Sequence, residues 1–319
     1  MEAPPEVAAL ALVGTTASGK SDVALAVARV RPWVEIVSVD SMSVYRGMDV
    51  ATAKPSEPVR RAVPHHLVDV ADPSEEFTVA DYQRLARRAL VSIAARRHLA
   101  LLVGGTGLYL RSVVDGLALP GRWPEVASRL EHEADLPGGL VRLYQRLEVA
   151  DPLAASRIGP GNRRRIVRAL EVTLGSGRPF SSFGPGLESY RPVGTAMLGI
   201  PFDPELVDRR IEDRMRRWMD EGLVEEVRRL AGGEGGLSRT ARQALGYREV
   251  LAHLERGVAL EECVDEAIRR TRALARRQWS WFRRDPRIEW LVPGEDAVER
   301  VGEVLDRCRL AGQGTGRAG

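Results

Sequence analysis

The chain has 319 residues, of which 44% are hydrophobic and 29% are charged, a composition typical of a soluble globular protein with one large domain or two ordinary ones. No apolar run approaches the roughly 18 residues of a membrane-spanning helix, and the N-terminus lacks the basic start and apolar stretch of a signal peptide. Two cysteines, Cys263 and Cys308, cannot form a zinc site of four clustered thiolates. We therefore expect a cytoplasmic protein with reduced thiols and no membrane partner.

The basic residues are unusual in kind and in position. Of 47 Lys and Arg residues only Lys20 and Lys54 are Lys, which leaves 45 Arg. A retained lysine in such a background suggests a place that needs a compact ammonium group. Basic charge is concentrated in segments 157–178 and 269–287, which points to a polyanionic partner.

The first third of the chain alternates strand and helix patterns. Short apolar runs predict strands at 8–13, 34–39 and 99–103, and helical patterns fill 20–29 and 79–97. This order predicts an α/β fold with a P-loop-type parallel sheet and helices on both faces. The ligand of such a sheet binds at the carboxyl ends of its strands.

The character of the chain changes after residue 117. Helical segments at 125–135, 139–148 and 162–174, separated by Pro- and Gly-rich breaks, predict a small all-helical insertion domain over 118–190. A strand at 195–200 then returns to the core domain, formed by 1–117 and 191–310. The core domain continues with helices at 204–231, 239–255 and 260–283, and we expect the tail 311–319 to be disordered.

A phosphate-binding loop follows the first strand. The sequence GTTASGKS matches the pattern G-x-x-x-x-G-K-S between a strand and a helix. Its backbone N–H groups are expected to form an anion nest at a helix N-terminus, with a point charge from Lys20 and a magnesium ligand in the Ser21 hydroxyl. The loop consists of Gly14, Thr15, Thr16, Ala17, Ser18, Gly19, Lys20 and Ser21.

Two further strands end in candidate chemical groups. Asp40 follows the second strand, as a general base or as an N-cap, and Gly104-Gly105-Thr106 follows the third. The two glycines predict close approach of the backbone to a ligand. A small-molecule P-loop kinase that uses ATP, or a non-catalytic RNA-binding module, also fits the loop, but neither requires Asp40 and this Gly-Gly-Thr segment.

Seven segments, in this order, resemble those of the tRNA dimethylallyltransferase family, in its bacterial form: GTTASGKS, SVDSMSVYRGMDVATAKP, PHHLVDV, GGTGLYL, RRRIVRALEV, QALGYREVL and TRALARRQWSWFRR. The resemblance covers about residues 8–284. It implies transfer of a dimethylallyl group from dimethylallyl diphosphate to N6 of the adenine immediately 3′ of the anticodon in tRNA. Diphosphate would leave intact, with Mg²⁺ as cofactor, and we expect a monomer.

The resemblance also implies roles for individual residues. Asp40 would accept a proton or hydrogen bond from the adenine amine, and Thr106 would lie near the bridge between substrate and leaving group. Arg214 would reach the diphosphate, although an ordinary surface arginine is an equal alternative. The segments expected to contact tRNA contain Asp40, Ser41, Met42, Ser43, Arg164, Arg165, Ile166, Val167, Arg168, Gln243, Gly246, Tyr247, Arg248, Arg276, Arg277, Gln278, Trp279 and Arg283. Trp279 and Trp281 are alternatively packing residues of an amphipathic helix.

Overall fold

The structure is a computed structural model that describes residues 9–314, and it divides into two compact units. The core unit comprises residues 9–116 and 192–314, and the insertion unit comprises residues 117–191. The boundaries predicted from the sequence were 117–118 and 190–191.

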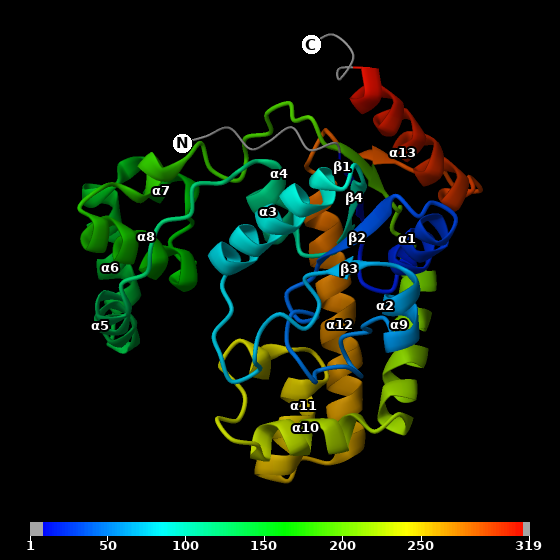
Figure 1. Cartoon of the computed structure of the whole chain (residues 1–319). Coiled ribbons are helices and arrows are strands. Elements are labelled where there is room, and N and C mark those ends of the chain that lie inside the picture. The colour runs from blue at the N-terminus through cyan, green and yellow to red at the C-terminus, as the bar shows by residue number, and fades with distance from the viewer. Residues whose placement is uncertain (1–8, 315–319) are drawn as a thin grey trace. The chain divides into compact units, whose positions relative to one another are not determined.

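The core unit is built on six parallel strands (Figure 1). In chain order they are β1 (Ala9–Val13), β2 (Val34–Val39), β3 (His65–His66), β4 (Leu99–Gly104), β5 (Ala196–Gly199) and β6 (Glu289–Trp290). Their order in the sheet is β3-β2-β4-β1-β5-β6. This confirms the predicted α/β class, although β3 and β6, at the two edges of the sheet, are too short to be recognised from periodicity.

Alternating side chains fix the two faces of the sheet. Leu10 and Leu12 of β1 pack against α1 (Lys20–Arg29) and α13 (Ala297–Gly314), as do residues of β2 and β4. Ala9, Ala11 and Val13 pack in the opposite layer with α3 (Val79–Ala95) and α4 (Gly107–Val114). Figure 1 shows these helix pairs on opposite sides of the strands. The period of two along each strand therefore produces the predicted double coverage.

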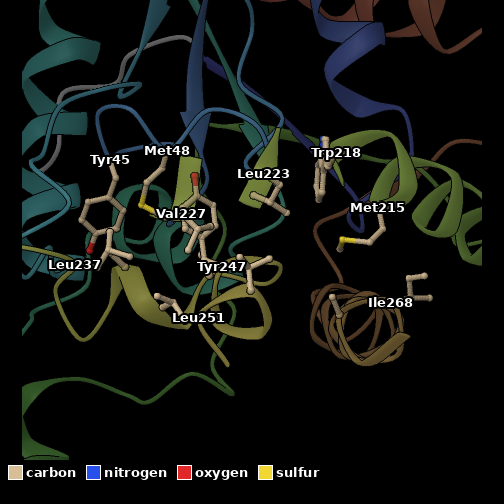
Figure 2. Close-up of a cluster of buried hydrophobic side chains, with 14 of the residues drawn as sticks. Tyr45, Met48, Met215, Trp218, Leu223, Val227, Leu237, Tyr247, Leu251 and Ile268 are labelled. Carbon is tan, nitrogen blue, oxygen red and sulfur yellow. The ribbon is translucent and has the colours of Figure 1, made fainter. Parts of the chain in front are cut away.

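A second apolar core lies beyond the carboxyl edge of the sheet. It joins the loop after β2 to α9 (Pro204–Asp220), α10 (Leu223–Gly232), α11 (Tyr247–Arg256) and α12 (Leu260–Phe282). Figure 2 shows Tyr45 and Met48 from the loop beside Tyr247 and Leu251 of α11. This core fixes the position of the long segment that follows Asp40 in the chain.

Two predicted helices of the core unit are interrupted. The helix expected over 204–231 is α9 followed by α10, because Gly222 adopts a φ of 93° that a continuing helix does not allow. The helix expected over 239–255 is a 3₁₀ turn, Ala241–Gln243, followed by α11, with Gly246 at a φ of 89° between them. Helix α2 (Glu57–Ala62) was not predicted.

The insertion unit is helical throughout its regular structure. It contains α5 (Pro124–Asp135), α6 (Gly139–Ala150), α7 (Pro152–Arg157), α8 (Arg163–Ser176) and a 3₁₀ turn, Phe180–Phe183. These elements enclose their own core, in which Leu130, Leu143, Leu147, Ile166 and Leu170 are buried. An independent core explains why this segment forms a separate unit.

The expectation of a disordered C-terminal tail is wrong in part. The predicted disordered tail, 311–319, begins inside α13, which continues to Gly314. The helix is anchored by buried Val301 and Leu305, and backbone hydrogen bonds extend it at little further cost. Residues 315–319 lie outside the described residues. Within the described range, none of the helices combines the length and apolar composition of a membrane span.

Candidate active site

Three neighbouring strands deliver the candidate site residues to one edge of the core unit. In register, Gly104 at the end of β4 lies between Val39 of β2 and Val13 of β1. The next residues of these strands are therefore Asp40, Gly105 and Gly14. The strand order thus places the carboxylate and the phosphate loop on either side of the Gly-Gly-Thr segment.

The loop from Gly14 to Gly19 has the conformation of an anion nest. Ala17 and Gly19 have positive φ values of 60° and 94°, which turn successive backbone N–H groups inward before α1 begins at Lys20. The hydroxyls of Thr15 and Ser18 are buried and have no hydrogen-bond partner among the described residues. A strained backbone with unsatisfied donors indicates a ligand site rather than a structural turn.

Two cationic side chains converge on the loop. Lys20 Nζ donates a hydrogen bond to the Thr15 carbonyl (3.0 Å), and Arg214 Nη2 of α9 donates one to Thr16 Oγ1 (2.7 Å). Burial lowers the pKa of Lys20 to about 8, against the opposing effect of Asp40 and with a further contribution from Arg214. Burial also lowers the pKa of Arg214. The Cζ atom of its guanidinium lies 4.8 Å from the centroid of the Trp218 ring. Arg214 is therefore not an ordinary surface arginine.

Asp40 begins a tight turn and uses only part of its carboxylate to do so. Its Oδ1 accepts hydrogen bonds from the N–H groups of Met42 (2.7 Å) and Ser43 (3.1 Å). Its Oδ2 accepts none from the residues that the structure describes. One oxygen thus orients the group, and the other can serve a ligand.

Thr106 is the N-cap residue of α4, but its side chain makes no capping hydrogen bond. Instead, Thr106 Oγ1 accepts a hydrogen bond from the N–H of Ser41 (3.3 Å), the residue after Asp40. The hydrogen bond ties the acidic turn to the Gly-Gly-Thr segment.

The glycines of this segment make room for protein groups. A Cβ at Gly104 would lie 2.0 Å from the Val39 carbonyl oxygen, and a Cβ at Gly105 would lie 2.4 Å from Gln278 Nε2. A Cβ at Gly107 would lie 2.1 Å from Trp281 Nε1. The expectation that Gly104 and Gly105 admit a ligand is thus replaced by close contacts with β2 and α12.

The predicted tRNA residues of the core unit fall into buried and exposed groups. Tyr247 is fully buried and donates a hydrogen bond to Glu226, whose carboxylate also accepts the N–H groups of Asp49 and Val50. Trp279 stacks on Phe202 (5.9 Å) and contacts Trp290 edge-on, which is the packing alternative. The exposed residues are Gln243, Arg248, Arg276, Arg277 and Arg283.

The other predicted tRNA residues of the core unit are less exposed than these five. Ser43 and Gly246 are buried, and Ser41, Met42 and Gln278 are partly exposed. Arg276 pairs with Asp208 of α9 at 2.8 Å. Glu226, which holds the loop after Asp40, was not singled out from the sequence, because nothing local distinguishes it from other helical glutamates.

The predicted arginines of the insertion unit lie on α8. Arg164 and Arg165 are exposed, and neither side chain has an ion pair or hydrogen bond among the described residues. Arg168 is tethered to Glu171 (2.8 Å) and to the Pro120 carbonyl (2.9 Å), while Ile166 and Val167 are buried in the unit's core. Arg164 and Arg165 are thus the pair available to an external anion.

Two polar clusters of the core unit have structural roles. Lys54 is buried and binds Asp49 (2.8 Å), Asp69 (2.5 Å) and the Tyr45 carbonyl. His66 bonds to buried Glu35 at 2.6 Å, and His98 and Arg96 bond to the same carboxylate. Burial raises the pKa of Glu35, but the hydrogen bonds from these three side chains outweigh it and hold the pKa at about 2. Glu35 lies near the amino end of β2, and Lys54 binds the loop that follows Asp40.

The fold and this edge define the class of protein. A parallel sheet with a G-x-x-x-x-G-K-S loop between β1 and α1 is a P-loop fold, here with a carboxylate after β2 that interacts electrostatically with Lys20 of the loop. The model of the IPP transferase family matches residues 43–285. The chain belongs to this family.

Full-length relatives agree with this assignment. The chain is 46% identical over 313 residues to a tRNA dimethylallyltransferase of Desulforudis audaxviator, covering 97% of each chain. It is 47% identical over 310 residues to one of Streptomyces coelicolor, covering 97% of this chain and 95% of that one. A solved tRNA isopentenylpyrophosphate transferase from Bacillus halodurans is 33% identical, with a TM-score of 0.67 and coverage of 96% and 99%.

Proposed function

We propose that this chain transfers the dimethylallyl group of dimethylallyl diphosphate to N6 of the adenine immediately 3′ of the anticodon in tRNA and releases diphosphate. The relatives named above are tRNA dimethylallyltransferases, and none of those reported is a kinase. The observation that carries the proposal is the pairing of an anion nest, with Lys20 and Arg214, and an oriented carboxylate at Asp40.

The anion nest would hold the leaving group. The bond that breaks joins the prenyl carbon to the bridging oxygen of the diphosphate, so negative charge grows on oxygens that leave intact. Backbone N–H groups of the loop, Lys20 and Arg214 stabilise that charge, and they do so more strongly in a partly buried site than in water. The unpartnered hydroxyls of Thr15 and Ser18 supply two further donors.

Asp40 would act on the nucleophile. The exocyclic amine of adenine is a weak nucleophile because its lone pair is delocalised into the ring. As the new N6–carbon bond forms, Asp40 Oδ2 accepts the amine proton, while Oδ1 remains bonded to the turn. Thr106, which is joined to that turn through Ser41, would lie near the bridge between the adenine and the leaving group.

The residues of the loop fit Mg²⁺ bound with the diphosphate. Mg²⁺ prefers oxygen ligands and keeps several waters, and Ser21 places an exposed hydroxyl in the first turn of α1. Within residues 9–314 no cluster of three acidic, His or Cys side chains could hold a metal alone. Ser21, water and diphosphate oxygens would therefore hold the ion, which supplies charge neutralisation of the leaving group.

The tRNA must present its adenine outside the anticodon-loop stack, as enzymes that act on bases require. Exposed arginines of the proposed interface, Arg164 and Arg165 in the insertion unit and Arg277 and Arg283 on and after α12, would bind backbone phosphates. The proposal includes a cytoplasmic location and a monomeric state, and sedimentation of the purified protein with and without tRNA would test the monomeric state.

A donor comparison tests the proposed reaction. Purified protein is incubated with Mg²⁺, tRNA and either dimethylallyl diphosphate labelled in the prenyl group or ATP labelled in the γ-phosphate. We expect prenyl label on the RNA and no phosphate label on RNA or on added metabolites. Phosphate transfer without prenyl transfer would establish the kinase alternative, and RNA binding without either transfer would establish the binding module.

A further inference from the structure

One side chain of α12 connects two parts of the active site that are far apart in the sequence. Gln278 Oε1 accepts a hydrogen bond from the Thr16 N–H of the phosphate loop (2.7 Å), and Gln278 Nε2 donates one to the Gly105 carbonyl (3.0 Å). The oxygen of this amide therefore bonds to the loop after β1, and its nitrogen bonds to the segment after the neighbouring strand, β4.

The site is shaped to receive this amide. The missing Cβ of Gly105 is what admits Gln278 Nε2, because an alanine there would place carbon 2.4 Å from that nitrogen. One turn further along α12, the Trp281 ring fills the space above Gly107, and Phe282 is buried in the core under the sheet. The amide is thus held by a helix whose next turn has fixed contacts with the rest of the core unit.

The two hydrogen bonds of Gln278 form a bridge that restrains the phosphate loop in its anion-binding conformation. Thr16 precedes Ala17, the residue with a positive φ, and its hydroxyl receives Arg214. A loop with a left-handed residue and unpartnered hydroxyls needs an external restraint to remain preorganised, and the Gln278 amide restrains its backbone at that point. Its other end is fixed to the segment that carries Thr106.

We propose that Gln278 is a positioning residue that preorganises the phosphate loop for diphosphate, and that it does not serve as a contact for tRNA. This deepens the proposed function, since it assigns a determinant of donor binding within the same site. It also changes the interpretation of the α12 segment: Arg277 and Arg283 are exposed, whereas the oxygen and the nitrogen of the Gln278 amide each already bond to the protein backbone.

The test separates binding of the two substrates. Gln278→Met keeps the length of the side chain and removes both hydrogen bonds, which together are worth about a tenfold change in affinity. We expect the Kd for inorganic diphosphate, measured by calorimetry, to rise about tenfold. The Kd for tRNA should stay within about twofold of wild type, and KM for the prenyl donor should rise with a smaller change in kcat. An unchanged diphosphate Kd with weaker tRNA binding would overturn the proposal.

A second variant protects the test against a folding failure. Gly105→Ala leaves Gln278 in place but displaces its amide, so it should reproduce the loss of diphosphate affinity, and the double variant should lose little more than either single one. Full additivity, or an unchanged diphosphate Kd in Gly105→Ala, would refute the bridge. Gln243→Met, at an exposed glutamine in another predicted tRNA segment, is the matched control and should leave diphosphate binding unchanged. Wild-type protein that binds no diphosphate would instead refute the proposed function.

Discussion

Replacing Lys20 by Met should stabilise the ligand-free protein while removing its affinity for diphosphate. Burial lowers the pKa of Lys20 from 10.5 to about 8, so at pH 7 the folded protein carries a charge that its surroundings disfavour. At about 1.4 kcal/mol for each pH unit, this difference corresponds to roughly 3 kcal/mol. Lys20 keeps some solvent exposure and bonds to the Thr15 carbonyl, so we expect a net gain of about 1–2 kcal/mol.

The pH dependence has a definite sign. The folded-state pKa lies below the unfolded one, so the cost of the charge is fully present below pH 8 and disappears as the pH rises from 8 to 10.5. The stability advantage of Lys20→Met should therefore be largest at pH 7 and should shrink at pH 9.5. Denaturant unfolding at the two pH values measures it, and calorimetry should show at least about a 100-fold weaker Kd for diphosphate.

Lys54→Met is the matched control, since Lys54 is the only other lysine in the chain. Its ammonium is paired with Asp49 and Asp69, and its removal leaves the partly buried Asp69 with one cation fewer. This variant should lose stability and keep its diphosphate site. A Lys20→Met protein that is destabilised as Lys54→Met is, or that binds diphosphate as well as wild type, would refute the account of the anion site.

Three further predictions concern the acid, the RNA and the fold. Asp40→Asn keeps an Oδ1 acceptor for the turn, so kcat should fall about 10²–10⁴-fold while the Kd for tRNA stays within about twofold; parallel loss of both would make Asp40 structural. Changing Arg164 and Arg165 together to Gln should weaken tRNA binding and reduce the slope of log K against log salt by about 1–2; an unchanged slope would remove them from the interface. Glu35→Gln should lower the unfolding free energy by roughly 3 kcal/mol at pH 7, and the difference from wild type should vanish as the pH falls from 4.5 toward 2; a constant difference would contradict the ion cluster.

The four longer strands, β1, β2, β4 and β5, and the phosphate loop are local features, and the sequence was sufficient to predict them. A five-residue apolar run followed by G-x-x-x-x-G-K-S specifies β1, the loop and the start of α1 whatever the rest of the chain does. Asp40 and Thr106 are predictable to the same extent, because residues that follow parallel strands share one edge of the sheet. Their hydrogen bonds to Ser41, Met42 and Ser43 were not predictable.

The contacts that close the site come from distant parts of the chain. Nothing around Gly105 indicates that its missing side chain admits Gln278, which lies 173 residues later. Similarly, the rarity of lysine marked both Lys20 and Lys54, but only the structure separates an anion-site lysine from one that pairs with Asp49 and Asp69. Periodicity alone also missed the break at Gly222, because apolar spacing continues across it.

The central claim is tested most directly by a single change in the RNA. Two tRNA transcripts that differ only in carrying A or G immediately 3′ of the anticodon are incubated with the protein, Mg²⁺ and dimethylallyl diphosphate, and the digested nucleosides are identified by mass. We predict one dimethylallyl group on N6 of that adenine, one diphosphate released for each group transferred, and no product on the G transcript. Prenylation at another base, or consumption of the donor without any modified nucleoside, would contradict the account.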